Sequence, residues 1–408
     1  MTTTSTTPTP RFTARVYLAL GALALGGFTI GTTEFATMGI LMFIASDLTV
    51  TEATAGHAIT AYAMGVVVGA PLIAIATARL SRSRLIVLLM ALYAGANTLS
   101  AFAPDLTWLI VGRFIAGLPH GVFFGVGAVV GTAIVGPAKR GFAMSIMLGG
   151  LTVANVVGVP LSSWLGHAMG WRASFIAVGI LGALAVVILL MALPAVSAEP
   201  GASPASELAS MKNPRLWWVF VGSAVGFGGM FAIYSYVQPM AVLGAGVSDR
   251  VIPLLLALFG TGMTVGIGFA GRMMDRNVRL TVTVGFVSTS VALVFLGFTG
   301  HMPVWLFVGV FFVGFTAQYL ALGLQGLLMD LSPKAPSLGA ALCHSALNLA
   351  NANGAFLGGV VLAATTGYQG LAWLGLGLTV LGFAMIQITT RTHDARDSKV
   401  QQVLQSLE

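Results

Sequence analysis

The chain has 408 residues, of which 57% are hydrophobic and only 8% are charged, and its formal net charge is +7 at pH 7. A soluble domain carries about 25% charged residues, so this composition excludes a soluble protein and indicates a membrane protein. The single cysteine, Cys343, excludes an internal disulfide framework and a multi-cysteine metal site.

Apolar runs of about 20 residues, separated by charges or by Pro/Gly clusters, predict an all-α membrane protein with twelve transmembrane helices. The predicted helices lie near residues 16–43, 54–78, 85–103, 107–135, 141–166, 172–194, 214–242, 250–271, 280–300, 303–331, 337–365 and 370–390.

The segments between and around these helices predict two six-helix bundles. The N-terminal bundle covers 16–194 and the C-terminal bundle covers 214–390. A linker at 195–213 is rich in Pro, Ser and Ala, which favours a flexible cytoplasmic connection. The Thr-rich leader 1–15 has no obvious cleavage site, so we expect it to be disordered and retained, and 391–408 forms a cytoplasmic tail.

The positive charges predict the topology. With the N-terminus inside, only Arg172 and Arg250 of the 19 Lys and Arg residues fall outside, and Arg113 lies within a helix, which leaves 16 inside. This bias favours an even number of helices with both termini in the cytoplasm. Because the basic residues are dispersed in short loops, we expect a lipid bilayer as the partner and no nucleic acid.

The two halves repeat one another. "WLIVGRFIAG" from Trp108 aligns with "WLFVGVFFVG" from Trp305, and "ANVVG" from Ala154 aligns with "ANANG" from Ala350. A parallel repeat of six-helix halves is typical of transporters whose bundles rock about a central site.

These motifs resemble the major facilitator superfamily over essentially the whole chain. "GTTEFATMGIL", "RFIAGLPHGVFFG" and "GGLTVANVVGVP" are similar to the first-, fourth- and fifth-helix motifs of its drug/proton antiporter branch, in particular of sugar-efflux and chloramphenicol-resistance type exporters. The resemblance associates Arg113 with proton transfer and implies a bacterial cytoplasmic (inner) membrane.

The resemblance also implies a set of gating residues. "GRMMDRNVR" keeps the inter-helix motif of the superfamily, whereas "ATARLSRSR" in the first half lacks its Asp, and in the fifth helix Val159 separates the expected Gly-Pro pair. The implied gating and conformational residues are Gly158, Pro160, Gly271, Asp275, Arg276 and Arg279.

Glu34 is a carboxylate inside a predicted span. A charge near the bilayer centre costs roughly 2.5 kcal/mol or more, so it needs a partner or a task. Glu34 lies 13 residues before Asp47 and His120 lies 15 residues after Asp105, which places both about 20 Å from the outer surface.

Arg113 lies on the same predicted helix as His120, about 12 Å deep. We therefore expect Glu34 to face the bundle interior near His120, with Arg113 reaching down from above. Glu34, Arg113 and His120 are the proton-coupling candidates, and the alternative is a structural bridge between Glu34 and Arg113. Gly117, Gly121 and Gly125 make a small-residue ridge for close helix packing.

Uncharged polar and aromatic side chains mark the substrate site. They recur at helical spacing on single faces of helices seven, ten and eleven, which suits a neutral or amphipathic organic molecule. The alternative is that the amides bond helix to helix. The candidates are Phe231, Tyr234, Gln238, Gln318, Gln325, His344, Asn348 and Asn351.

A secondary exporter driven by proton antiport and alternating access is the function that these features favour, with proton-coupled uptake as the alternative. The sequence lacks a Gly-x-x-x-x-Gly-Lys-[Ser/Thr] loop for a primary pump and a paired-carboxylate, Ser/His/Asp or metal constellation for an enzyme. We expect no cofactor beyond the proton as coupling ion, a small-molecule substrate and a monomer. Drug, sugar, nucleoside and small metabolite all fit a neutral cavity.

Overall fold

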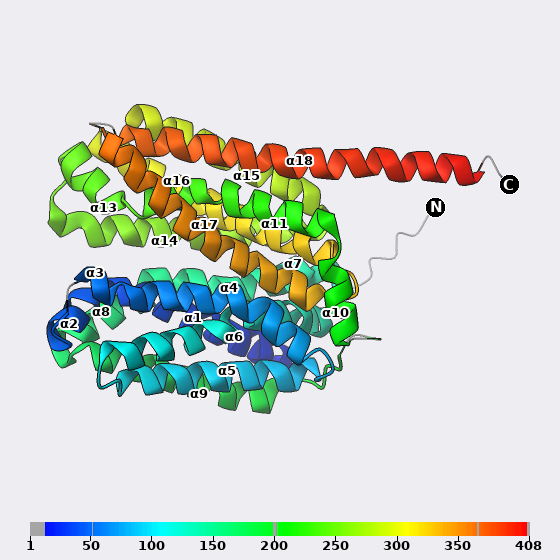
Figure 1. Ribbon diagram of the computed structural model, residues 1–408, viewed down its shortest axis with the longest axis horizontal. Helices are drawn as coiled ribbons and strands as arrows, with labels where there is room; N and C mark the ends of the chain where they lie inside the picture. The colour runs from blue at the N-terminus through cyan, green and yellow to red at the C-terminus, as the bar shows by residue number, and fades with distance from the viewer. Residues whose placement is uncertain (1–12, 51, 199–200, 202, 365–366, 406–408) are drawn as a thin grey trace, which may run out of the picture.

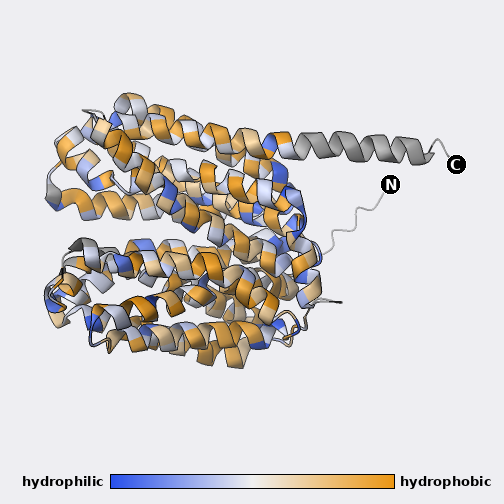
Figure 2. Ribbon diagram, viewed as in Figure 1, coloured by the Kyte–Doolittle hydropathy of each residue, from blue (hydrophilic) through white to orange (hydrophobic). Residues whose placement is uncertain are grey.

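The computed structural model is a set of helices that run side by side in two stacked bundles (Figure 1). It describes residues 13–405 except 51, 199–200, 202 and 365–366. Apolar residues extend along the helices and hydrophilic residues gather toward their ends (Figure 2), as a bilayer requires. The prediction of an all-α membrane fold with two helical halves is confirmed.

The N-terminal bundle contains the elements from α1 to α9. They are α1 (Ala14–Gly39), α2 (Leu41–Asp47), α3 (Glu52–Ala55), α4 (His57–Ala76), α5 (Arg82–Ala101), α6 (Leu106–Val135), η1 (Pro137–Lys139), α7 (Arg140–Val153), η2 (Ala154–Gly158), α8 (Val159–Met169) and α9 (Trp171–Ala192).

The short helix α10 (Pro204–Met211) leads into the C-terminal bundle. That bundle contains α11 (Pro214–Gly226), α12 (Gly228–Tyr234), α13 (Val237–Pro239), η3 (Met240–Gly244), η4 (Asp249–Val251), α14 (Ile252–Arg276), α15 (Val278–Thr299), α16 (Pro303–Asp330), α17 (Pro336–Ala364) and α18 (Gln369–Gln405). We call the end of the molecule that carries α10 the linker end, and the opposite end, with α2 and α13, the far end (Figure 1).

Eleven helices in the described part of the chain are long and apolar enough to cross a membrane. The remaining predicted span, 337–365, is the continuous 29-residue helix α17. His344, Asn348 and Asn351 all lie on this helix. The expected tail at 391–408 is not a separate segment, because α18 continues without a break to Gln405.

Capping residues and prolines set several helix boundaries. Asp105 caps α6 by accepting a hydrogen bond from the Trp108 amide at 3.0 Å, and Asn277 caps α15 through the Leu280 amide at 2.9 Å. Gly136 and Gly170 adopt φ values of +90° and +86° where α6 ends and α9 begins, a conformation that favours glycine.

Three of the predicted helices are interrupted. The helix predicted at 16–43 breaks at Ile40 into α1 and α2, and the one at 141–166 contains the π-helical turn η2. The helix predicted at 214–242 is divided into α11, α12, α13 and η3. Pro160 and Pro239 lie at two of these interruptions. A proline has no N–H to donate to the carbonyl four residues back, so the regular helical hydrogen bond is missing there.

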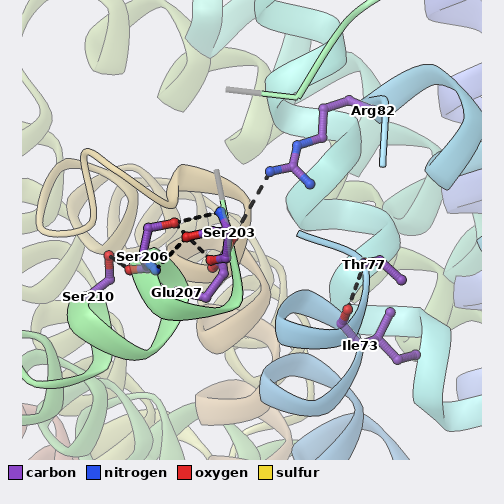
Figure 3. A network of polar contacts seen from close by, with 7 residues as sticks. All are labelled: Ile73, Thr77, Arg82, Ser203, Ser206, Glu207 and Ser210. Carbon is purple, nitrogen blue, oxygen red and sulfur yellow. Dashed lines mark hydrogen bonds and ion pairs between the residues drawn. The ribbon is translucent and has the colours of Figure 1, made fainter. Parts of the chain in front are cut away.

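The linker is held against the N-terminal half, in contrast to the flexible connection that its composition predicts. Its first part is attached to Ser83, whose hydroxyl accepts from the Val196 amide at 2.8 Å and donates to the Pro194 carbonyl at 2.6 Å. Its second part is α10, which begins with a capping box between Ser203 and Ser206 (Figure 3).

The Glu207 side chain of α10 points toward Arg82 at the start of α5 (Figure 3). The two side chains are 1% and 2% exposed, and Glu207 Oε1 lies 4.0 Å from Arg82 Nη2. A charge buried at such a site needs an opposite charge nearby, and this ion pair joins α10 to α5. Most of the leader expected at 1–15 lies outside the described residues, which begin at Thr13, and α1 begins at Ala14.

We predict that Glu207→Gln loosens the linker, because Arg82 then loses its buried counter-charge at a cost of about 3 kcal/mol. Trypsin should cleave the Lys212–Asn213 bond several-fold faster than in the wild-type protein. Ser210→Ala is the matched control, since its hydroxyl bonds only to the Ser206 carbonyl within α10. Equal cleavage of all three proteins would show that the ion pair does not hold the linker.

A second polar cluster joins α2 to α9 at the far end. The Arg172 guanidinium donates to the Asp47 carboxylate, and the Trp171 indole donates to it at 3.0 Å. These hydrogen bonds, first from Arg172 and then from Trp171, hold the pKa of Asp47 below its ordinary value of 3.8.

Because the folded-state pKa of Asp47 is lowered, the stabilisation is present above about pH 3.8 and is lost as the pH falls through the folded-state value. Asp47→Asn should therefore lower the melting temperature slightly at pH 7, and the difference from wild type should close below pH 3.8. Asp47 is 48% exposed, so solvent keeps the effect small. A melting difference that is the same at neutral pH and well below the ordinary pKa of Asp47 would contradict the assignment.

Candidate functional site

A cavity lies between the two halves and is lined by α1, α6 and α7 on one side and by α12, α14, α16 and α17 on the other. Eight of the eleven predicted proton-coupling and substrate-binding residues line it. They are Glu34, His120, Phe231, Tyr234, Gln318, Gln325, His344 and Asn348.

Glu34 is the acidic residue that α1 presents to this cavity. The hydroxyls of Thr29, Thr32 and Thr37 on the same helix all donate to carbonyls of α1 itself, at 2.8, 2.8 and 3.1 Å. Glu34 is partly exposed, and among the residues that line the cavity it is the only Asp or Glu. Glu34 and His120, which were expected at the same depth, both line this cavity.

His120 is held in position by a hydrogen bond with Tyr62 of α4. The Tyr62 hydroxyl lies 2.8 Å from His120 Nδ1, and with the hydroxyl donating, the ring proton of His120 is on Nε2. The His120 ring also lies 5.3 Å, centroid to centroid, from the ring of His344 on α17. These two histidines therefore meet across the interface between the halves.

Arg113 is buried beside Tyr62 within the N-terminal half, and it does not line the cavity. Its guanidinium lies 4.3 Å from the centroid of the Tyr62 ring and donates, at 3.5 Å, to the Thr33 carbonyl and to Asn97 Oδ1. In the described part of the chain no ion pair joins Arg113 to Glu34. The guanidinium is accommodated by a ring face and neutral oxygens instead.

Sequence reasoning missed Tyr62, the residue that touches both Arg113 and His120. Its signal was present in "AYAMGVVVGAPL", where Gly65 and Gly69 follow it at helical spacing. Gly65 and Gly117 let α4 and α6 approach closely, and this contact brings the Tyr62 ring beside α6.

Two predicted substrate residues do not reach the cavity. Gln238 is exposed, because the helix breaks at Ser235 and Tyr236 and so does not keep Gln238 on the face of Phe231 and Tyr234. Asn351 is half-buried on α17, outside the cavity lining.

The halves are closed against each other at the linker end by polar contacts. The Gly141 amide at the start of α7 donates to Asp275 Oδ1 of α14 at 2.6 Å. Beside it, Arg140 forms a two-pronged ion pair with Asp330 of α16 at 2.8 and 3.2 Å. For the cavity to open toward the linker end, these contacts would have to break.

The predicted gating residues divide into three groups. Gly271 and Asp275 lie in the linker-end closure, where Gly271 faces Ser145 and Gly141. Arg276 and Arg279 are exposed on the same end. Gly158 packs against Thr32 of α1, and Pro160 is exposed two residues later.

The small-residue ridge of α6 packs in two directions. Gly117 lies against the Tyr62 carbonyl of α4, whereas Gly125 lies against the Ser337 carbonyl of α17 in the other half. The tight contact of α6 with α17 therefore also belongs to the linker-end closure.

Toward the far end, the cavity is covered by aromatic rings. Phe35 of α1 meets Tyr234 of α12 edge to face with 5.9 Å between ring centroids, and Tyr234 lies 4.6 Å from Phe259 of α14. The cavity measures only about 50 Å³. Ligand sites for drug-sized molecules measure roughly 300–1,000 Å³, so the halves must separate before such a molecule can enter.

We predict that Gly141→Ala weakens the linker-end closure, because the added Cβ would collide with the Gly271 carbonyl and Asp275. The readout is maleimide labelling of Ser337→Cys in a Cys343→Ser background, since Ser337 is buried against Gly125. Labelling should become several-fold faster.

Gly149→Ala, on the same helix α7, is the matched control because its Cβ would meet nothing within 4 Å. If Gly141→Ala and Gly149→Ala are labelled at the same rate, the Gly141–Asp275 contact does not keep this end closed.

Comparison with known families and proteins extends these observations. The sequence model of the family called the Major Facilitator Superfamily matches residues 23–249 and 237–407. The chain is 34% identical over 377 residues to the inner membrane transport protein YdhP of Escherichia coli K12, covering 92% of this chain and 97% of that protein.

The chain is also 34% identical over 381 residues to a chloramphenicol resistance protein of Streptomyces lividans, covering 92% of this chain and 96% of that protein. Among solved structures, the proton:xylose symporter XylE bound to 6-bromo-6-deoxy-D-glucose superposes with a TM-score of 0.72. That match covers 90% of this chain and 94% of XylE at 14% identity, so it concerns the fold alone.

Proposed function

Because the chain belongs to the Major Facilitator Superfamily of membrane transporters, we propose that it exports a neutral or amphipathic small organic molecule in exchange for protons. Its efflux-type relative, the chloramphenicol resistance protein, supports the outward direction. An inner membrane relative and the bias of basic residues support a bacterial cytoplasmic membrane, with the linker end and both termini in the cytoplasm.

The observation that carries the proposal is the position of Glu34. A coupling group must be titratable and must be reached from one side of the membrane at a time. Glu34 lines a cavity that both halves share, it is partly exposed there, and no arginine or lysine side chain lines that cavity with it. A proton on Glu34 therefore neutralises a charge that the two halves enclose, which links protonation to the closing of the bundles.

We propose that Arg113 contributes to proton coupling through its neighbours and without an ion pair with Glu34. Its guanidinium binds the carbonyl of Thr33, the residue before Glu34, and holds the ring of Tyr62, which in turn contacts His120. Arg113 thus positions the backbone beside the carboxylate and the second titratable group of the cavity. We infer that His120, whose ring lies 5.3 Å from that of His344 on α17, is the second proton-coupling residue.

We predict that Glu34→Gln abolishes gradient-driven transport while the protein still folds and binds substrate. Glutamine keeps the shape and hydrogen-bonding capacity of the side chain and removes the titratable group. Transport in proteoliposomes should fall at least about tenfold with an unchanged melting temperature. Asp47→Asn is the control, since Asp47 pairs with Arg172 at the far end, outside the cavity.

If Glu34→Gln transports normally under a pH gradient, Glu34 is not the coupling group. A lowered melting temperature with proportionate loss of binding would instead favour a structural role for the carboxylate.

Proton-coupled uptake is the alternative, because the same carboxylate could serve a symporter. Proteoliposomes with an acidic lumen and chloramphenicol as the probe distinguish the two. In antiport the probe accumulates in the lumen as the lumen becomes alkaline, whereas in symport the probe leaves the lumen together with protons.

A further inference from the structure

The cavity contains a buried hydrogen-bond donor that has no partner. Gln325 of α16 is only 1% exposed and lines the cavity, and its Nε2 amide group makes no hydrogen bond within the described part of the chain. Burying a donor without an acceptor is unfavourable, and native proteins rarely do so without a reason. A ligand that enters the cavity would supply the missing acceptor.

Asn348 of α17 offers a hydrogen-bond acceptor to the same cavity. Its Nδ2 donates to the His344 carbonyl of its own helix at 3.0 Å, so the amide N–H serves the helix. The Asn348 carbonyl oxygen is then the group that this side chain can present to a ligand. The C-terminal half therefore contributes a donor from α16 and an acceptor from α17 to one cavity.

Apart from Gln318 and His344, the rest of this wall is formed by aromatic and aliphatic side chains. Phe231 and Tyr234 of α12, Phe259 of α14 and Leu347 of α17 line it, and the rings of Tyr234 and Phe259 lie 4.6 Å apart at an angle of 31°. Such surfaces bind flat, apolar groups through ring stacking and burial. The only formal charge among the residues that line the cavity is that of Glu34, on the opposite wall.

We propose that Gln325 and Asn348 are the specificity-determining residues of this transporter and select neutral molecules in which an amide or hydroxyl group is attached to an apolar ring. The ligand oxygen accepts from Gln325, its N–H or O–H donates to Asn348, and the ring lies against Phe231, Tyr234 and Phe259. This proposal rests on the transport function proposed above and assigns the substrate class.

The same wall disfavours sugars. A sugar carries a hydroxyl on nearly every carbon, and each buried hydroxyl needs a partner. Here the polar groups of Tyr234, Gln318, Gln325, His344 and Asn348 are interspersed with aromatic and aliphatic side chains, against which hydroxyls of a sugar would have to be buried.

The test measures binding to the purified full-length protein by equilibrium dialysis, without a proton gradient. The probes are N-acetyl-phenylalaninamide, which has a ring and amides, N-acetyl-alaninamide, which lacks the ring, and xylose. We expect N-acetyl-phenylalaninamide to bind at least about tenfold more tightly than the other two. Equal or tighter binding of xylose or of N-acetyl-alaninamide would overturn the proposed class.

The second part of the test compares two glutamine variants. Gln325→Leu should weaken binding of N-acetyl-phenylalaninamide about tenfold and should keep or raise the melting temperature, because it removes an unpaired buried amide. Gln387→Leu is the control, since Gln387 donates to Thr283 Oγ1 at 3.1 Å and should lose stability with unchanged binding.

If Gln325→Leu lowers the melting temperature and leaves binding unchanged, Gln325 is a packing residue and the proposal is wrong. Because binding is measured without a gradient, this result is independent of transport. If the wild-type protein showed no proton coupling in the transport assay, the proposed function would be wrong, and the binding result would stand on its own.

Discussion

A charge inside a membrane protein has to be solvated by the protein itself, and this constraint organises the N-terminal half. Arg113 is fully buried, yet its guanidinium is surrounded by a tyrosine ring, a backbone carbonyl and an asparagine oxygen rather than by a carboxylate. The contacts of Arg113 therefore join α1, α4, α5 and α6 around one point. It also leaves Glu34 without a bound cation, so the carboxylate depends on the cavity for its environment.

The two ends of the interface between the halves are held together by different interactions. At the linker end, backbones approach at Gly141 and Gly271, and carboxylates of the C-terminal half bind the start of α7. Toward the far end, Phe35 touches Tyr234 through a ring edge. The linker end is therefore held by hydrogen bonds with charged partners, and the far end by contacts between aromatic rings.

Much of the fold could be predicted from the sequence because lipid imposes a simple rule on it. Long apolar runs between short basic loops have few alternatives to membrane-spanning helices, and the repeat of "ANVVG" and "ANANG" shows that the halves are related. The rule says nothing about breaks within a helix. The interruption at Ile40 therefore appeared only in the structure.

The candidate site was predictable where depth and helix periodicity were sufficient. Depth brought Glu34 and His120 to one cavity, and periodicity did the same for Gln318 and Gln325. Periodicity failed at Gln238, where the helix is broken, and depth failed for Arg113, because a long side chain can turn toward a neighbouring helix. Tyr62 was missed because the glycines that follow it, Gly65 and Gly69, indicate a close helix contact but do not identify the residues that the tyrosine touches.

The docking of α10 has a consequence for the order in which the protein is made. The residues that bind the linker, Arg82 and Ser83, lie on α5 and leave the ribosome long before Val196 and Glu207 do. The N-terminal half with α10 attached can therefore be completed as a unit while the C-terminal helices are still being synthesised. Asn213, which follows α10, donates to the Leu331 carbonyl at 3.1 Å, so the linker is attached to the second half only after α16 has been inserted.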